Sequence, residues 1–192
     1  ADGIRWVEGI ADIPEQREDN SIVFNGVVLD TTERKNAENG WRTLVEASKN
    51  FSSKNFLASV VEYIANTLDV NWVMVSQKEG NAIQSKAIWG NGKLQPNVKL
   101  SFTDDSPCVD IICFQYHNGL IYQENVQENF PNNELLQAAD AKVYIGVPLL
   151  NLQAEVIGNL CIFHHQPLTE INRIKSILNV FADRIAAELE RT

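Results

Sequence analysis

Apolar residues recur along much of the chain with two distinct periods, one typical of helices and one of strands. Residues 53–68 and 169–191 carry apolar positions three and four apart, which predicts two amphipathic helices. The stripe on residues 169–191 is wider than a helix needs to cover its own domain, so we expect a partner helix there. The apolar face of the first helix comprises Phe56, Leu57, Val60, Val61, Ile64 and Leu68.

Strand patterns lie between these two helices. Residues 71–76 and 82–89 are rich in β-branched and aromatic side chains and flank a turn cluster, which predicts an antiparallel pair. Residues 143–152 and 156–163 are apolar almost without interruption, which predicts strands that are buried on both faces. Together with the helices, these strands predict an α+β fold in which helices lie on the faces of a central antiparallel sheet.

A further helix is predicted between the two strand pairs. Ser106 stands at the N-cap and Pro107 at the first helical position. We expect the helix to continue to about Asn118, because Gly119 is suited to the left-handed position that ends a helix. Its expected buried stripe is Val109, Ile112, Cys113 and Tyr116.

The first fifty residues form a separate unit in this pattern. Alternating apolar positions predict a two-stranded hairpin with a long polar loop. A lone hairpin is marginally stable in water, so we expect it to belong to something larger. Asp30-Thr31-Thr32-Glu33 then has the spacing of a reciprocal helix cap. We therefore divide the chain into a hairpin at residues 1–32, a connecting helix at 33–50 and the main domain at 51–192.

Composition and charge narrow the range of partners. The 192 residues carry a net charge of −9, which disfavours nucleic acid and anionic membrane surfaces. The longest apolar run, residues 143–150, is far shorter than the roughly 20 residues that span a bilayer. No secretory signal opens the sequence, and three cysteines fit a reducing compartment better than a disulfide scaffold. We therefore expect a cytoplasmic protein with no membrane contact.

Motifs within residues 51–192 resemble the GAF domain family. The resemblance implies a regulatory sensor domain with a sheet, a central helix and a small-ligand pocket between them. The motifs are Ser106-Pro107-Cys108, Tyr144-Ile145-Gly146-Val147-Pro148-Leu149 followed by Val156-Ile157-Gly158-Asn159-Leu160, and the terminal segment from Phe181 to Arg191.

Residues 4–9 and 23–35 resemble the C-terminal hairpin of a PAS domain. A PAS hairpin, a connecting helix and a GAF domain in this order imply a fragment of a bacterial multidomain signalling protein. Sensor kinases of two-component systems and cyclic-dinucleotide enzymes are built in this way. The resemblance therefore also implies an output domain downstream in the full-length chain.

The GAF resemblance predicts a pocket for a small planar ligand, and the alternative is that the same side chains simply fill the core. Relatives that bind cyclic nucleotides carry an Asn-Lys pair, and relatives that attach a bilin covalently carry a Cys-His dipeptide. This sequence has neither, so we expect no covalent bilin, and the cofactor stays unknown. The predicted ligand-binding residues are Trp89, Phe102, Cys108, Val109, Ile112 and Tyr144.

Catalytic motifs are missing from the sequence, which has neither a Gly-x-Ser-x-Gly elbow nor a phosphate-binding loop. We therefore expect no enzyme. The alternative is a free methionine sulfoxide reductase, the GAF class that uses cysteine chemistry. Cys108, at the start of its helix, is either an activated thiol or a small buried apolar residue. We expect neither Cys113 nor Cys161 to form a disulfide with Cys108 without backbone movement.

His164 and His165 are the remaining candidates for a metal site. Consecutive residues of a strand point to opposite faces, so we expect the two rings to diverge. No other Cys or His pair with ligand spacing supports them. The sequence therefore predicts no metal site.

These patterns and the resemblance together predict a non-catalytic sensory or relay module that forms a parallel homodimer through residues 31–50 and 169–191. A small ligand or a change upstream would alter the packing of these helices and so act on the output domain. The predicted interface residues are Trp41, Leu44, Ile171, Ile174, Leu178, Phe181 and Ile185.

Overall fold

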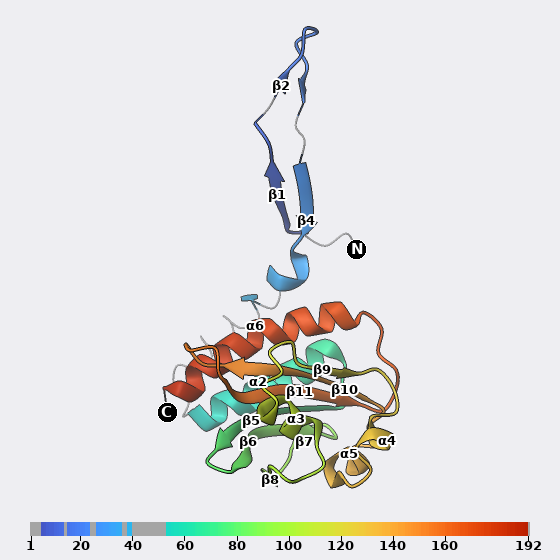
Figure 1. The fold of residues 1–192 in the computed structure, drawn as a ribbon. Helices are drawn as coiled ribbons and strands as arrows, with labels where there is room; N and C mark the ends of the chain where they lie inside the picture. Colours follow the sequence, from blue (N-terminus) through green and yellow to red (C-terminus); the bar gives the residue numbers. More distant parts are fainter. Residues whose placement is uncertain (1–4, 14, 24–25, 36–37, 40–52, 192) are drawn as a thin grey trace.

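The computed structural model of the protein describes residues 5–13, 15–23, 26–35, 38–39 and 53–191. Figure 1 shows a hairpin that extends away from a body of helices and strands. The hairpin consists of β1 (Val7–Ala11), β2 (Glu15–Gln16), β3 (Ile22–Val23) and β4 (Gly26–Asp30). The body consists of α2 (Ser53–Leu68), β5 (Trp72–Glu79), β6 (Ala82–Gly90), β7 (Lys93–Leu94), β8 (Lys99–Ser101), α3 (Pro107–Cys113), β9 (Leu120–Tyr122), α4 (Val126–Asn129), α5 (Glu134–Ala138), β10 (Val143–Leu150), β11 (Val156–His164) and α6 (Ile171–Glu190).

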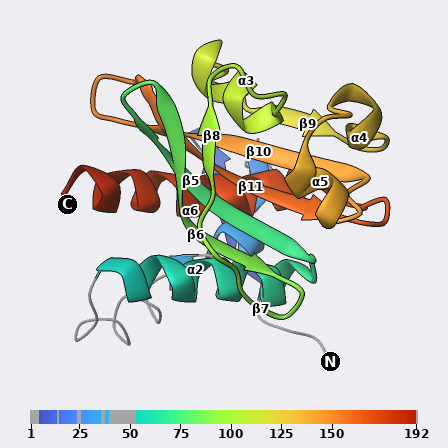
Figure 2. The same ribbon diagram turned by 90° about the horizontal axis from the view of Figure 1, so that it is seen from below.

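One antiparallel sheet organises the body. Its strands lie in the order β7-β6-β5-β11-β10-β9, and β8 also pairs with β6. Helices α2 and α6 pack on one face of the sheet, and α3 packs on the other. In Figure 2, α3 and α2 lie on opposite sides of the strands. The predicted α+β fold, with helices on both faces of a central antiparallel sheet, is confirmed.

The sheet face under α2 and α6 is covered by aliphatic and aromatic side chains, and we call it the apolar face. Side chains alternate along a strand, so every second residue of β10 and β11 contributes to it. The predicted stripe of α2 is buried here, with Leu68 at its half-buried end. Helix α6 adds Ile174, Ile177, Leu178, Phe181, Ala182, Ile185, Ala186 and Leu189.

Helix α3 begins as predicted and ends early. Ser106 Oγ accepts a hydrogen bond from the backbone nitrogen of Cys108 at 3.3 Å, and Pro107 occupies the first turn. Gln115 then adopts φ +52, and Tyr116 N donates to Ile111 O at 3.0 Å, which closes the helix in a Schellman motif. The predicted extension to Asn118 is therefore wrong.

The hairpin stands apart from both packed layers. Strand β1 pairs with β4 from Val7 opposite Asp30 to Ala11 opposite Gly26, which confirms the predicted hairpin. Every residue of both strands is exposed. Of the predicted connecting helix, a helical turn at residues 32–35 is described, whereas Trp41 and Leu44 lie outside the described residues. No helix in the described part of the chain is long and apolar enough to cross a membrane.

Candidate functional site

A cluster of polar and sulfur-bearing side chains is buried between α3 and the sheet, and we call this side the polar face. Cys108 Sγ lies 3.8 Å from Cys161 Sγ and 3.6 Å from the hydroxyl oxygen of Tyr144. Asn159 Nδ2 donates to that oxygen at 3.2 Å, and Ser76 Oγ donates to Asn159 Oδ1. All five side chains are buried, so their hydrogen bonds form away from water.

Strand register brings this cluster together. Cys161 of β11 lies opposite Gly146 of β10 and opposite Met74 of β5. The ring of Tyr144 extends over Gly146, where a β-carbon would overlap the Tyr144 hydroxyl and lie 2.6 Å from Ile111 Cδ1. A glycine at this position therefore lets the Tyr144 hydroxyl reach the middle of the sheet.

Hydrogen bonding and burial shift the pKa values of the two thiols in opposite directions. A hydrogen bond from Cys161 outweighs burial at Cys108, and bonds with Asn159, Tyr144 and Ser106 add to it, so the pKa of Cys108 is lowered to about 7. Burial raises the pKa of Cys161, and the proximity of Cys108 raises it further. Burial also raises the pKa of Tyr144, which stays a neutral donor. Cys108 is therefore the thiol of the pair that loses its proton first.

An open cleft is lined by residues of β8, of α5 and of the loop that leads to α3. The volume of the cleft is about 730 Å³. A separate and much smaller gap of about 10 Å³ lies against Cys108 and Phe163. Leu100, Asn133 and Leu135 line both spaces. The cleft is lined by Val98, Lys99, Leu100, Thr103, Asp104, Asp105, Asn132, Asn133, Glu134 and Leu135.

The structure brings most of the predicted ligand-binding residues to the polar face. Cys108, Val109, Ile112 and Tyr144 are buried there, and Phe102 packs half-buried at its edge. They contact one another and fill the interior, which matches the alternative that these side chains complete the core. The open space lies beyond them, in the cleft.

Trp89 lies on the apolar face, contrary to the prediction. The cause is a β-bulge in β6: Ser85 pairs with Ser76 and Ala87 with Val75, so Lys86 is an extra residue. One inserted residue moves every following side chain to the opposite face of a sheet. Trp89 therefore packs toward α2 and α6 instead of toward α3.

The cysteines lie closer than the sequence suggests, and the expected need for backbone movement before a disulfide forms stays a prediction. The sulfur atoms of Cys108 and Cys161 are in contact, although the sequence places one in a helix and the other in a strand. Their approach depends on how α3 crosses β11, which no local pattern reveals. Cys113, the last residue of α3, is exposed, and Tyr116, beyond the end of the helix, is 41% exposed. The predicted buried stripe is therefore wrong at these two positions.

His164 and His165 do not diverge as predicted. Their ring centroids are 4.8 Å apart, because β11 ends at His164 and the alternation of side chains ends with it. Asn71 lies against both residues: its backbone nitrogen donates to His164 Nδ1 at 3.3 Å, and its Oδ1 accepts from His165 N at 3.4 Å. No group of three potential metal ligands occurs among the described residues.

Two buried polar residues were missed in the sequence. Asn159 interrupts the apolar run of residues 156–163, and Ser76 ends the first β-rich run. A single amide side chain in a fully buried strand needs hydrogen-bond partners. This requirement could have identified Asn159 in the sequence as part of a buried polar cluster. The structure supplies Ser76 and Tyr144 as those partners.

The predicted dimer residues on α6 lie within the subunit. Ile174, Leu178, Phe181 and Ile185 are buried against the apolar face, and Ile171 packs half-buried beside them. The apolar stripe of α6 is wide because this helix packs on both the sheet and α2. Association through α6 stays a prediction, and its contacts would come from the opposite, exposed side of the helix.

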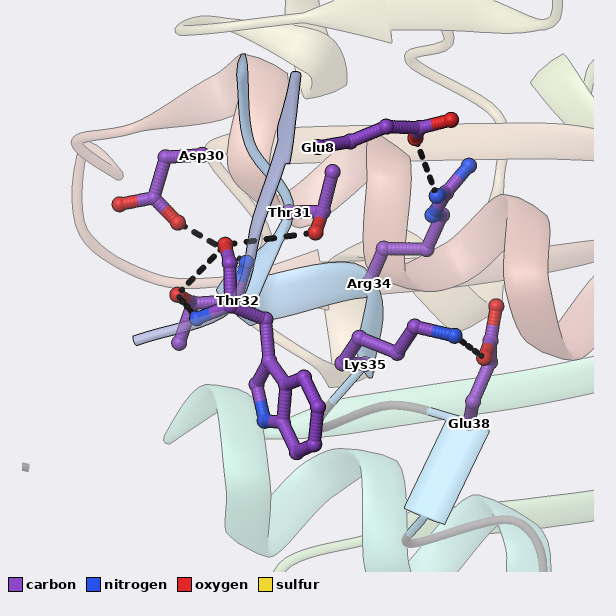
Figure 3. A network of polar contacts seen from close by, with 8 residues as sticks. Glu8, Asp30, Thr31, Thr32, Arg34, Lys35 and Glu38 are labelled. Atoms are coloured by element: carbon purple, nitrogen blue, oxygen red, sulfur yellow. Dashed lines mark hydrogen bonds and ion pairs between the residues drawn. The ribbon is translucent and has the colours of Figure 1, made fainter. Parts of the chain in front are cut away.

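A polar network fixes the exit of the hairpin (Figure 3). Asp30 Oδ1 accepts from Thr32 N at 2.9 Å, and the side chains of Arg34 and Glu8 pair at 3.0 Å. Glu33, between Thr32 and Arg34, reaches the body: Arg173 Nε of α6 lies 3.0 Å from Glu33 Oε2. The hairpin exit and the start of α6 are thus joined by an ion pair.

Comparison with known proteins gives a family and a set of similar folds. The model of the GAF domain family matches residues 54–189. No curated protein matches the sequence. The fold is similar to the nlh2 GAF domain of A. aeolicus in an inactive state, with a TM-score of 0.64 and 15% identity, covering 83% of this chain and 98% of that one.

Two further solved structures show the range of this fold. The GAF domain of a phosphoenolpyruvate-protein phosphotransferase from Acinetobacter has a TM-score of 0.62 and 14% identity, covering 81% of this chain and 93% of that one. A type II free methionine-R-sulfoxide reductase from Thermoplasma acidophilum has a TM-score of 0.58 and 16% identity, covering 72% of this chain and 93% of that one. At such identities these similarities concern the fold alone.

Proposed function

The chain belongs to the GAF domain family, and from that premise we propose that it is a regulatory sensory module of a signal-transduction protein and not an enzyme. The observation that carries this proposal is the ion pair between Arg173 and Glu33. It joins the exit of the hairpin to the first turn of α6, and the buried side of α6 packs on the sheet. A change in the hairpin and a change in the sheet therefore act on the same helix.

In this proposal the cleft beside α5 holds the ligand. Tyr144 and Phe163 occupy the interior under α3, so the cleft offers the space that the interior lacks. Its volume of about 730 Å³ falls in the range of roughly 300–1,000 Å³ typical of small-molecule sites. Asp104, Asp105 and Glu134 outnumber Lys99 on its walls, which favours a small polar ligand with a positively charged group.

The hairpin, in the same proposal, is the last part of a PAS-type domain. Ile10 is 70% exposed and Val27 is 62% exposed, although such side chains in a sheet are normally covered by a second layer. Strands of a larger sheet would cover them. The ion pair at Glu33 would then transmit a displacement of that domain to α6.

Two copies are proposed to associate in parallel through the exposed side of α6, with an output domain as the recipient of the signal. Small and polar side chains on this side permit close approach of two helices. These residues are Asn172, Ser176, Asn179, Asp183 and Ala187.

Native mass spectrometry of freshly purified protein tests the ligand site. We expect a small molecule to accompany the folded chain and to be absent after Asp104→Lys with Glu134→Lys, because both substitutions reverse charge in the cleft. Glu190→Lys, on the exposed end of α6, is the matched control and should keep the molecule. Equal retention by the cleft variant and the control would exclude the cleft as the site.

Sedimentation velocity tests the association. We expect the protein to sediment as a dimer and Ser176→Arg with Ala187→Arg to sediment as a monomer, since both residues lie on the exposed side of α6. Gln153→Arg, in the turn between β10 and β11, should remain dimeric. A monomeric parent protein, or a dimeric α6 variant, would contradict the proposed interface.

A thiol-based reductase is the second candidate function, and the contact between Cys108 and Cys161 is the observation that favours it. In that case free methionine sulfoxide should be turned over in the presence of a dithiol reductant, and Cys108→Ser should abolish the turnover. Cys113→Ser, at an exposed thiol, is the control that should leave turnover unchanged. Absence of turnover by the reduced parent protein would exclude this candidate.

A further inference from the structure

We propose that Cys108 and Cys161 form a reversible intramolecular disulfide when the protein meets hydrogen peroxide, so that the buried pair is a redox-modification site. The inference does not depend on the regulatory role, on the hairpin or on a second copy of the chain. It rests on the contact of the two sulfur atoms, on the size of the gap beside Cys108 and on the hydrogen-bond partners of the pair.

The geometry suits a disulfide within one chain. The two sulfur atoms are 3.8 Å apart, and a disulfide bond of about 2.05 Å requires them to approach by less than about 2 Å. Cys108 lies in the first turn of α3 and Cys161 lies in a central strand, so we expect the end of the helix, and not the strand, to supply this movement. Both thiols are buried, which prevents a bond with a thiol of another chain.

The gap beside Cys108 limits which oxidant can reach it. Its volume of about 10 Å³ corresponds to about one water-sized sphere. Hydrogen peroxide exceeds water by one oxygen atom and needs only a small widening of this gap, whereas free methionine sulfoxide is several times larger than either. The gap also shares Leu100, Asn133 and Leu135 with the open cleft, so the cleft is the neighbouring space from which an oxidant would enter.

The partners of Cys108 favour its reaction as the nucleophile. Asn159 donates to the Tyr144 hydroxyl oxygen, so the Tyr144 hydrogen is free to point toward Cys108 Sγ, 3.6 Å away. Ser76 holds the Asn159 amide in this orientation. Among the described residues, the titratable groups in hydrogen-bond contact with Cys108 Sγ are Tyr144 and Cys161, and neither carries a charge that would oppose a thiolate.

The chemistry balances with hydrogen peroxide as the oxidant. The Cys108 thiolate attacks one peroxide oxygen, the O–O bond breaks, and an S–O bond forms as hydroxide leaves. Cys161 sulfur then attacks the sulfur of this sulfenic acid, the S–O bond breaks, the S–S bond forms, and the second hydroxide leaves. With the two thiol protons, the hydroxides leave as two water molecules. A small dithiol returns both sulfur atoms to thiols.

The test uses the full chain with Cys113→Ser, which leaves only the proposed pair. The reduced protein is treated with a small excess of hydrogen peroxide under native conditions, then unfolded in acid and treated with a thiol-blocking reagent. We expect mass spectrometry to show the loss of two hydrogen atoms, no blocked thiol, and one peptide pair joined through Cys108 and Cys161. Dithiothreitol should restore two blockable thiols. Recovery of both thiols in blocked form after peroxide treatment would overturn the proposal.

Matched variants assign the roles within the pair. In the same background, Cys161→Ser should stop at a sulfenic acid on Cys108 that dimedone traps, and Cys108→Ser should leave Cys161 reduced. Trapping on Cys161 instead would overturn the assignment of Cys108 as the nucleophile. Free methionine sulfoxide in place of peroxide should produce no disulfide. A disulfide formed with methionine sulfoxide would overturn the size argument and favour the reductase candidate.

Discussion

The two faces of the sheet use neighbouring residues of the same strands for different purposes. Ile145 and Ile162 face α6 in a layer of purely apolar side chains, whereas Tyr144 and Cys161, one residue away, face α3 in a hydrogen-bonded cluster. Among the described residues, the fully buried members of this layer are aliphatic side chains and phenylalanine, which neither titrate nor oxidise readily, so the layer is insensitive to small chemical changes. The polar face holds groups that titrate and oxidise, separated from α6 by the thickness of one sheet.

The proposed regulatory role requires a domain that is both stable and responsive, and this contrast supports it. The apolar face anchors α2 and α6 through the burial of large side chains, which dominates folding energetics. The polar face also buries large apolar side chains, and in addition it contains Cys108, whose chemistry depends on its hydrogen bonds. A change at α3 can therefore alter the sheet without disrupting the packing of α6 on the apolar face.

The largest expected effect comes from truncation on the apolar face. Phe181→Ala should lower the free energy of unfolding by about 3–5 kcal/mol, because a fully buried ring leaves a cavity. Urea unfolding measures this change. Phe114→Ala, at a ring that is 64% exposed, is the control and should cost less than about 0.5 kcal/mol. Equal costs for the two variants would mean that α6 is not packed on the sheet as described.

A smaller effect is expected on the polar face, where added volume meets the Tyr144 hydroxyl. Gly146→Ala should lower the free energy of unfolding by about 1–3 kcal/mol and slow the peroxide reaction of Cys108, because Tyr144 must move. Tyr144→Phe in the same chain should return part of this cost, with a coupling of about 0.5–3 kcal/mol. Gly9→Ala on the exposed hairpin, where a β-carbon meets no neighbouring atom, is the control. Additive costs of the two substitutions would refute the contact.

The apolar face was largely predictable from the sequence, and the polar face was not. Helical spacing of three and four determines which side of α2 and α6 is buried, since that period depends on the helix alone. The position of Trp89 depends on a bulge at Lys86, which shifts the alternation by one residue, and the continuous apolar run of residues 87–89 hides this shift in the sequence. The contact between Cys108 and Cys161 depends on the crossing of two elements distant in sequence, so only the tertiary structure reveals it.

A pH dependence should distinguish the polar face from the apolar one. The pKa of Cys108 is lowered to about 7 from 9.0, so between these values the folded protein binds fewer protons than the unfolded chain. The free energy of unfolding should therefore rise with pH in this window, and the gain should be lost as the pH falls through about 7. Urea unfolding of the reduced Cys113→Ser protein across this window measures the slope.

Cys108→Ser in the same background is the control for this slope. It removes the titrating thiol while keeping a small hydrogen-bonding side chain, so the rise between neutral and alkaline pH should disappear. Cys161 opposes the trend only at higher pH, because its pKa is raised. An unchanged slope in the variant would assign the pH dependence to other groups.

The smallest expected effect lies at the ion pair between Arg173 and Glu33, which connects the hairpin exit to the apolar layer. Both side chains are partly exposed, so a double-mutant cycle of Arg173→Ala and Glu33→Ala should give a coupling of only about 0.2–1 kcal/mol.

Hydrogen exchange is the more informative measurement for this ion pair. A signal relayed from the hairpin would change the protection of backbone amides at the start of α6 without a large loss of stability. Arg173→Ala should increase exchange in the first turn of α6 and leave β11 unchanged. Glu170→Ala removes the other carboxylate that pairs with Arg173 and keeps Glu33, so it should preserve protection if the connection to the hairpin is what matters. Equal loss of protection in the two variants would reduce the ion pair to a local helix contact and remove the connection on which the proposed relay depends.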